Sequence, residues 1–171
     1  RYRALFEAAG RTHAIDPELL AIVALVESGG WTAAKSGSGA RGLMQVMPTT
    51  GAIIAAERGL EEHDTAKLNE PAYNIDFGAW YLGRQLRAFA SDDFATTVEH
   101  AAGAYNGGPT HYRRFLADEV TLSAQTQRYR RWVGGMWRER RAVRSETYRA
   151  WLEAGGDRLV WAARQEMEAA D

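Results

Sequence analysis

The sequence predicts a mainly α protein, and three observations carry that prediction. Helix start and stop signals recur along the chain, with capping residues or prolines ahead of apolar segments and glycines behind them. The longest apolar run, from Leu19 to Val26, has the length of a core helix. No segment shows the alternation of apolar and polar residues that marks a half-buried strand, although residues 31–47 have room for a short hairpin.

The first predicted helix covers residues 17–28. Asp16 is a favoured N-cap residue, and Pro17 fits the first helical turn. The segment is apolar on nearly all sides, which predicts a position at the centre of the fold. Glycines at positions 29 and 30 end the helix.

Later helices are predicted from the same kinds of signal. Residues 31–47 are rich in turn formers and are expected to be irregular. A break at Gly134-Gly135 is expected inside the long C-terminal helical segment. The helices that follow the irregular segment are predicted over residues 48–59, 71–89, 94–105, 109–117, 123–153 and 157–169.

Composition limits the class of protein. The 171 residues are enough for one domain with an appended segment, and the formal net charge of -1 gives no general attraction to nucleic acid. The chain has no cysteine, and its four histidines lack metal-ligand spacing, so we expect no metal and no cofactor. No apolar run is long enough for a transmembrane segment. Because the chain begins at Arg1 without a charged and then apolar leader, we expect a processed or trimmed product.

Glu27 is the most unusual residue of the first helix, because it is an acid at the end of an apolar run. Carboxylates are rarely buried without a reason. Desolvation and the negative end of a helix dipole are both expected to raise the pKa of such a carboxyl group. A raised pKa suits a general acid that must be protonated near neutral pH. The alternative is a helix-terminal glutamate that points to water.

Three further segments carry groups suited to binding a sugar. Residues 39–48 read GARGLMQVMP, residues 104–109 read AYNGGP, and a later segment contains Thr126 and Tyr129. The amide of Gln45 can donate and accept hydrogen bonds. Met44 can supply an adaptable apolar wall, although core filling is the plainer role for a methionine.

Together with Glu27-Ser28, the order and spacing of these segments resemble the catalytic domain of the soluble lytic transglycosylases. The resemblance covers residues 13–133 and departs from the family at Gln125, where Glu is usual, and at Arg130, where an aliphatic residue is usual. It implies a lysozyme-like helical domain over residues 1–133. Residues 134–171 would then form a C-terminal helical extension.

The resemblance also implies the reaction, which is cleavage of the β-1,4 bond between N-acetylmuramic acid and N-acetylglucosamine in peptidoglycan with formation of a 1,6-anhydro product. Glu27 matches the single glutamate that serves as acid and base in this family. The family acts in the cell envelope, so we expect export to the periplasm or envelope. The residues that match substrate-contacting positions are Ser28, Met44, Gln45, Tyr105, Asn106 and Tyr129.

Two other functions remain open from the sequence. The same fold could act as a muramidase that uses water, with a second carboxylate such as Asp76 or Glu99 brought near by folding. A non-catalytic murein-binding module is the other alternative, although a pure binder has no need of a protonated acid at position 27. Tryptophans in residues 134–171 predict that this extension packs on the domain or docks on an envelope protein partner.

Overall fold

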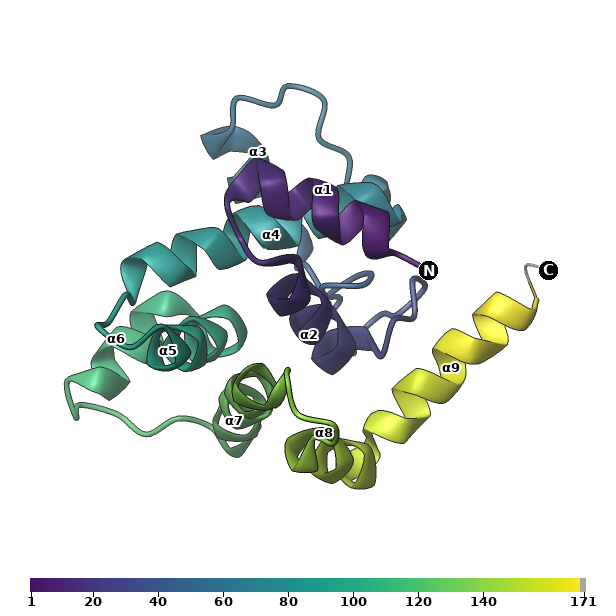
Figure 1. Cartoon of the computed structure of the whole chain (residues 1–171). Coiled ribbons are helices and arrows are strands. Elements are labelled where there is room, and N and C mark those ends of the chain that lie inside the picture. Colours follow the sequence, from purple (N-terminus) through teal and green to yellow (C-terminus); the bar gives the residue numbers. More distant parts are fainter. Residues whose placement is uncertain (170–171) are drawn as a thin grey trace. The chain divides into compact units, whose positions relative to one another are not determined.

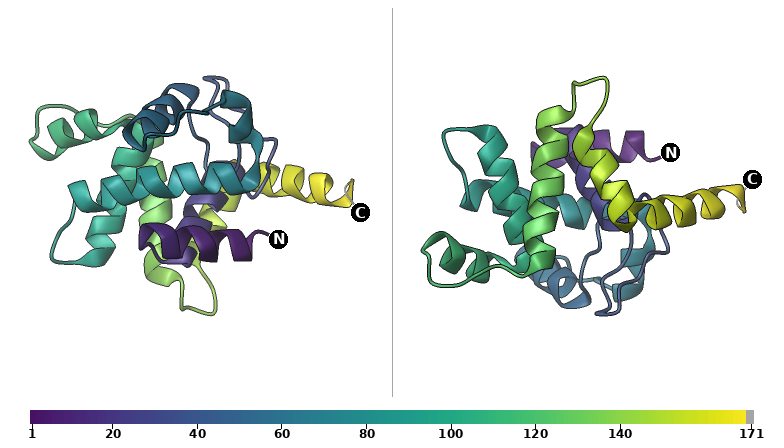
Figure 2. Two further views of the ribbon diagram at one scale, coloured as in Figure 1. Left: turned by 90° about the horizontal axis from the view of Figure 1, so that it is seen from above. Right: turned by 90° about the horizontal axis from the view of Figure 1, so that it is seen from below.

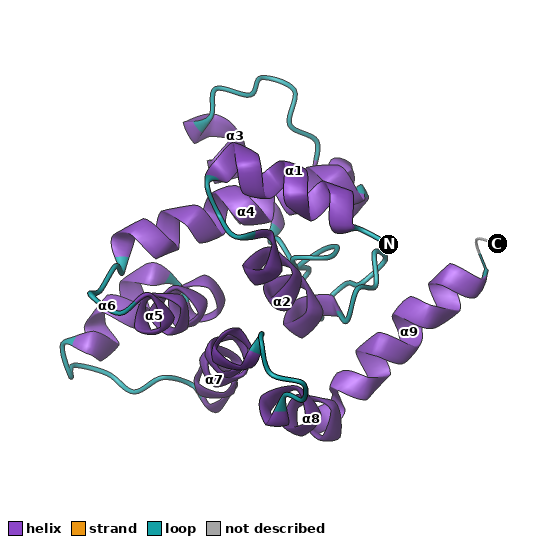
Figure 3. Cartoon of the chain, in the orientation of Figure 1, coloured by secondary structure: helices purple, strands orange, loops and turns teal. Residues whose placement is uncertain are grey.

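The structure is a computed structural model that describes residues 1–169, and it consists of helices joined by loops (Figure 1, Figure 3). The prediction of a mainly α fold is confirmed. The elements are α1 (Arg3–His13), α2 (Pro17–Ser28), α3 (Pro48–Glu57), the 3-10 helix η1 (Thr65–Asn69), α4 (Pro71–Ala88), α5 (Phe94–Gly107), α6 (Pro109–Leu116), α7 (Ala124–Glu139), α8 (Glu146–Trp151), the wide turn η2 (Leu152–Gly156) and α9 (Asp157–Glu168).

The contacts within the chain divide it into two units, which are described separately. Unit 1 contains Arg1–Trp80 together with the described residues from Leu152 onward, and unit 2 contains Tyr81–Trp151. The boundary predicted after residue 133, between the lysozyme-like domain and the C-terminal extension, stays a prediction. Within residues 1–169, no helix is both long and apolar enough to cross a membrane.

Helix α2 forms the centre of unit 1, as its apolar sequence predicts. The Asp16 carboxylate accepts a hydrogen bond from the backbone N–H of Glu18 at 2.8 Å, which satisfies one of the donors left open at a helix start. Gly29 ends the helix with φ 65°, a left-handed conformation that glycine adopts readily. The buried residues of α2 are Leu19, Leu20, Val23, Ala24, Val26 and Ser28.

Helix α1 begins without a polar capping residue and without a proline in its first turn. Tyr2, at its N-cap, makes no side-chain capping hydrogen bond, and the helix ends at Ala14 with φ 53°. The helix packs against α2 within unit 1. Its position therefore depends on this packing more than on capping residues.

The segment between α2 and α3 is irregular, as predicted, and contains a short paired region. Lys35 pairs with Arg41 and Arg41 with Val46 as isolated antiparallel bridges. The N–H of Arg41 donates to the carbonyl of Val46 at 3.1 Å, and the N–H of Val46 donates back at 3.0 Å. These reciprocal bonds close residues 42–45 into a tight turn.

In unit 2, α5 packs along α7 (Figure 2). The predicted helix break at Gly134-Gly135 is wrong. Both glycines lie inside α7, and the break comes instead after Arg140. A Cβ atom on Gly134 would lie 3.2 Å from the Cβ of Glu99, and one on Gly135 would overlap the Thr147 side chain. The two glycines therefore permit close packing, which offsets their low helix propensity.

Glu139 fixes the turn that follows α7. Its carboxylate accepts hydrogen bonds from the Ser145 hydroxyl at 2.5 Å, the Thr147 hydroxyl at 2.7 Å and the Thr147 N–H at 3.0 Å. These bonds, the one from Ser145 first, lower the pKa of Glu139 from its usual value. Because the carboxylate crosses from the end of α7 to the start of α8, the turn between them has a defined shape.

Candidate functional site

Glu27 lies in the last turn of α2 and is half-buried. The next residue, Ser28, is 0% exposed, and its hydroxyl lies 3.0 Å from the carbonyl of Ala24 and 2.9 Å from that of Leu43. The N–H of Gly30 donates to the same hydroxyl at 3.2 Å. Ser28 thus links the end of α2 to the segment that contains Met44 and Gln45.

Asn74, on α4, fixes the other side of this segment. Its Oδ1 accepts the N–H of Met44 at 2.7 Å, and its Nδ2 donates to the carbonyls of Arg41 and Leu68, both at 2.8 Å. The side chain is 0% exposed, so these bonds are protected from water. A buried polar residue with three such bonds is a structural hub, although Asn74 was not among the predicted site residues.

Gln45 has an uncommon backbone conformation for a residue other than glycine, with φ 46°. Its side-chain Nε2 donates to the carbonyl of Ala34 at 3.1 Å and to that of Gly42 at 2.9 Å. Both amide hydrogens therefore have acceptors within the described part of the chain. The side-chain group of Gln45 that is left to bind a sugar is Oε1, which can accept a hydrogen bond but cannot donate one.

Met44 is 0% exposed, as is Ser28. A Cβ atom on Gly78 of α4 would lie 2.6 Å from both Cβ and Sδ of Met44, so this glycine makes the space that the methionine fills. Direct contact of Ser28 and Met44 with a glycan stays a prediction. Their burial gives both residues a structural role in any case.

Unit 2 carries the other predicted residues. The rings of Tyr105 and Tyr81 meet edge to face, with centroids 5.3 Å apart. Oδ1 of Asn106, near the end of α5, accepts a hydrogen bond from the Thr126 hydroxyl of α7 at 3.0 Å. Tyr129 lies one turn further along α7 and is buried. The predicted segments 104–109 and 126–129 are therefore joined by a side-chain bond.

The predicted site residues divide between the units. Unit 1 contains Glu27, Ser28, Met44 and Gln45, and unit 2 contains Tyr105, Asn106 and Tyr129. Within each unit the structure connects the predicted segments through buried or half-buried hydrogen bonds. The role of each residue toward a ligand stays a prediction.

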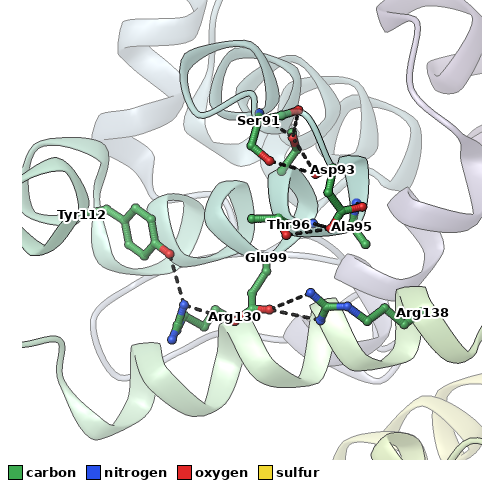
Figure 4. Close-up of polar contacts among 9 residues, drawn as sticks. Ser91, Asp93, Ala95, Thr96, Glu99, Tyr112, Arg130 and Arg138 are labelled. Atoms are coloured by element: carbon green, nitrogen blue, oxygen red, sulfur yellow. Dashed lines mark hydrogen bonds and ion pairs between the residues drawn. The ribbon is translucent and has the colours of Figure 1, made fainter.

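The two acids considered as second carboxylates are both ion-paired. In unit 1, Asp76 contacts Nε2 of His13 at 2.7 Å and the guanidinium of Arg58 at 2.5 Å. In unit 2, Glu99 contacts Arg130 at 3.1 Å and Arg138 at 3.0 Å (Figure 4). The departure from the family at position 130 thus has a structural role, because Arg130 joins α7 to α5.

Figure 4 also shows the capping of α5 by Asp93, whose carboxylate accepts bonds from the Thr96 hydroxyl at 2.7 Å and from the N–H groups of Thr96 and Ala95. These bonds, the one from the hydroxyl first, hold the pKa of Asp93 below its usual value. A carboxyl group with a lowered pKa stabilises the fold above its unfolded pKa of about 4, and the contribution is lost as the pH falls through the folded value.

We therefore expect the melting temperature of the wild type to fall relative to that of Asp93→Asn as the pH drops below about 4. Asparagine also caps helices well, so the two proteins should melt at similar temperatures near neutral pH. Melting curves of both proteins from neutral pH to about pH 3 check this. If the melting temperatures of the two proteins changed with pH in parallel, the lowered pKa of Asp93 would be contradicted.

Among residues 1–169, no group of three or more histidine, aspartate or glutamate side chains could hold a metal ion. The polar groups near the end of α2 include the Glu27 carboxylate, the Ser28 hydroxyl and the Gln45 amide. Such a set can transfer a proton and bind a neutral sugar.

Comparison with solved structures identifies the fold as one present in lytic transglycosylases. The chain is similar to an inactive glutamate-to-glutamine mutant of lytic transglycosylase Slt from Pseudomonas aeruginosa, with TM-score 0.68 and 25% identity, over 81% of this chain and 24% of that chain. It also resembles the 70 kDa soluble lytic transglycosylase of Escherichia coli, with TM-score 0.70 and 22% identity, over 85% of this chain and 25% of that chain.

The sequence matches the family described as Transglycosylase SLT domain over residues 4–127, so the chain belongs to that family. A relative, the endo-type membrane-bound lytic murein transglycosylase A of Klebsiella pneumoniae, is 41% identical over 78 residues. That match covers 44% of this chain and 38% of the relative, so the chain spans less than half of the relative's length. The predicted family and fold are confirmed.

Proposed function

We propose that this chain is the catalytic domain of a peptidoglycan lytic transglycosylase in which Glu27 is the single acid and base. The observation that carries the proposal is the position of Glu27 within the family match, in the last turn of the buried helix α2. The Pseudomonas relative was solved as an inactive mutant with one glutamate replaced by glutamine, which supports a reaction that depends on one carboxyl group.

In the proposed reaction, protonated Glu27 gives its proton to the glycosidic oxygen while the bond from that oxygen to C1 of the muramyl sugar breaks. The resulting carboxylate then takes the proton of the muramyl 6-hydroxyl, and O6 forms a bond to C1. The products are a glycan with a free 4-hydroxyl and a 1,6-anhydro-muramyl end. Glu27 is again protonated, and no water is consumed.

Local structure suits this role, because one carboxyl group must keep its position through two proton transfers. Ser28 links the end of α2 to the carbonyl of Leu43, and Asn74 fixes the adjoining Met44 backbone. Preorganised groups of this kind avoid reorganisation during the reaction. We propose that Gln45 Oε1, Tyr105, Asn106 and Tyr129 contact the glycan.

A water-using muramidase is less well supported. Such an enzyme needs a second carboxylate that can act as nucleophile or base. One oxygen of Asp76 contacts His13 and the other contacts Arg58, and each oxygen of Glu99 contacts an arginine. Neither acid is therefore well suited to that role.

We also propose that the domain acts in the periplasm or cell envelope, because peptidoglycan is found there. The Klebsiella relative is named as membrane-bound, which supports the same location. Residues 134–171 are a further candidate for docking on an envelope protein, since Trp161 of α9 is 65% exposed. Aromatic side chains exposed in this way are frequent at protein interfaces.

Digestion of purified peptidoglycan in heavy-oxygen water tests the proposed reaction. We expect the released muramyl ends to contain no solvent oxygen, because O6 of the same sugar occupies C1. Incorporation of one solvent oxygen at C1 would instead show hydrolysis. Binding of glycan without any release would show a murein-binding module.

A further inference from the structure

We propose that helix α9, which lies outside the residues that match the family, positions the end of helix α2, and that Glu166 is the positioning residue that fastens it. The inference rests on the proposed function, because positioning matters only if Glu27 is catalytic. Helix α9 is the last labelled helix in Figure 1, and it contacts α2 within unit 1. Three observations in unit 1 carry the proposal.

The first observation is a close crossing at Gly29. A Cβ atom on this residue would lie 2.5 Å from the carbonyl carbon of Leu159 and 2.6 Å from the backbone nitrogen of Val160. Only glycine allows the α9 backbone to come so near. Gly29 follows Glu27 by two residues, so α9 lies against the turn that ends the catalytic helix.

The second observation is the set of hydrogen bonds to Glu166. Its carboxylate accepts the N–H of Thr32 at 3.2 Å and the N–H of Ala33 at 3.1 Å. It also accepts the Thr32 hydroxyl and pairs with the guanidinium of Arg1 at 3.4 Å. The Glu166 side chain is 21% exposed, and its two bonds from Thr32 are part-buried. Hydrogen bonds to a charged carboxylate are stronger than those between neutral groups.

The third observation is that α9 is not packed along its whole length. A cavity of about 730 Å³ is lined by residues from α1, from the start of α2 and from α9, among them Phe6, Ala21 and Met167. Because the helices do not close this space, the Gly29 crossing and the Glu166 bonds provide a large part of the attachment.

The turn after α2 is therefore fixed at two points. Ser28 bonds to the carbonyl of Leu43 on one side, and Glu166 receives Thr32 and Ala33 on the other. The two glycines between them both have positive φ, 65° and 89°, in a conformation with little intrinsic stiffness. Loss of the Glu166 attachment is expected to loosen the last turn of α2 and to displace the Glu27 carboxyl group.

Glu166→Gln tests the proposal, because glutamine keeps the shape of the side chain. Its amide NH2 group is a donor, so it cannot accept the N–H groups of residues 32 and 33. On soluble glycan strands, we expect kcat to fall about tenfold, since displacement of a catalytic group by about 1 Å can cost 100-fold. The KM should stay within about twofold, because Glu166 is proposed to touch no substrate. Amide hydrogen exchange at Thr32 and Ala33 should become faster in the same variant.

The matched control is Glu168→Gln on the same helix, whose exposed carboxylate accepts a hydrogen bond from the nearby Gln165 side chain at 3.0 Å. We expect wild-type kcat and exchange from this control. If Glu166→Gln does not fold, Thr32→Val removes one hydroxyl donor alone and should lower kcat by a smaller factor, about threefold, as expected for loss of one hydrogen bond.

Faster exchange at residues 32 and 33 together with unchanged kcat would overturn the positioning role. Unchanged exchange would overturn the attachment itself. Wild-type activity is measured first, and its absence would overturn the proposed function and this inference with it. The exchange measurement needs no activity, so failure of the attachment and failure of the proposed function are distinguishable.

Discussion

Replacement of Glu27 by glutamine is expected to lower the rate of muropeptide release by about a thousandfold, because general acid–base catalysis contributes roughly 100- to 10,000-fold. One carboxyl group serves both proton transfers in the proposed reaction, so both are lost together. Glutamine has nearly the same shape as protonated glutamate, and we expect the melting temperature and glycan binding to be retained. Release of soluble products and binding to purified peptidoglycan measure the two effects separately.

The matched control is Glu57→Gln, at the last residue of α3, because this glutamate is also at a helix end in unit 1 but is exposed. It should release muropeptides at the wild-type rate. Near wild-type turnover by a folded Glu27→Gln protein would refute the catalytic assignment.

The second large effect is expected from Asn74→Leu. This substitution removes three hydrogen bonds, two of them buried, and leaves the N–H of Met44 and the carbonyl of Leu68 without the Asn74 side chain as partner, whereas the carbonyl of Arg41 keeps the N–H of Val46. We expect the free energy of unfolding to fall by about 3 kcal/mol, since each unsatisfied buried group costs roughly 1–3 kcal/mol. Thermal melting should show a decrease of about 6–12 °C.

Asn69→Ala is the control for this prediction. Asn69 is exposed, and its side chain makes one local hydrogen bond, to the carbonyl of Ala66 at 2.9 Å. Its loss should change stability by about 0.5 kcal/mol or less. If Asn74→Leu melted within a degree or so of the wild type, the loop would not depend on the Asn74 bonds.

The boundaries of α2 were predictable because their signals are local. Asp16 and Pro17 define the start, and Gly29 ends the helix through its own backbone conformation. Chemistry within four residues decides each of these boundaries. The whole fold class follows from the repetition of such signals along the chain.

The Gly134-Gly135 prediction failed because a glycine pair has two meanings in a sequence. It can end a helix, or it can let another element approach closely. The second meaning applies here, and it depends on Thr147 and Glu99, which pack against these glycines. Local sequence holds no information about those neighbours.

In the candidate site, too, residues with a local signal were predictable and residues defined by distant contacts were not. Glu27 was identifiable as an acid in an apolar run, and the resemblance added Gln45, Tyr105 and Asn106. Asn74 was not among the predicted site residues, and its one local signal is a polar side chain on the buried face of α4. Glu166 gave no signal, because its partner Thr32 lies 134 residues earlier in the chain.

Mass spectrometry of muropeptides released from purified peptidoglycan, with wild type beside Glu27→Gln, tests the central claim most directly. The account predicts wild-type products lighter by one water than hydrolysed muropeptides, and their absence from the mutant digest. Products with reducing muramyl ends, or anhydro products formed equally by the mutant, would contradict it.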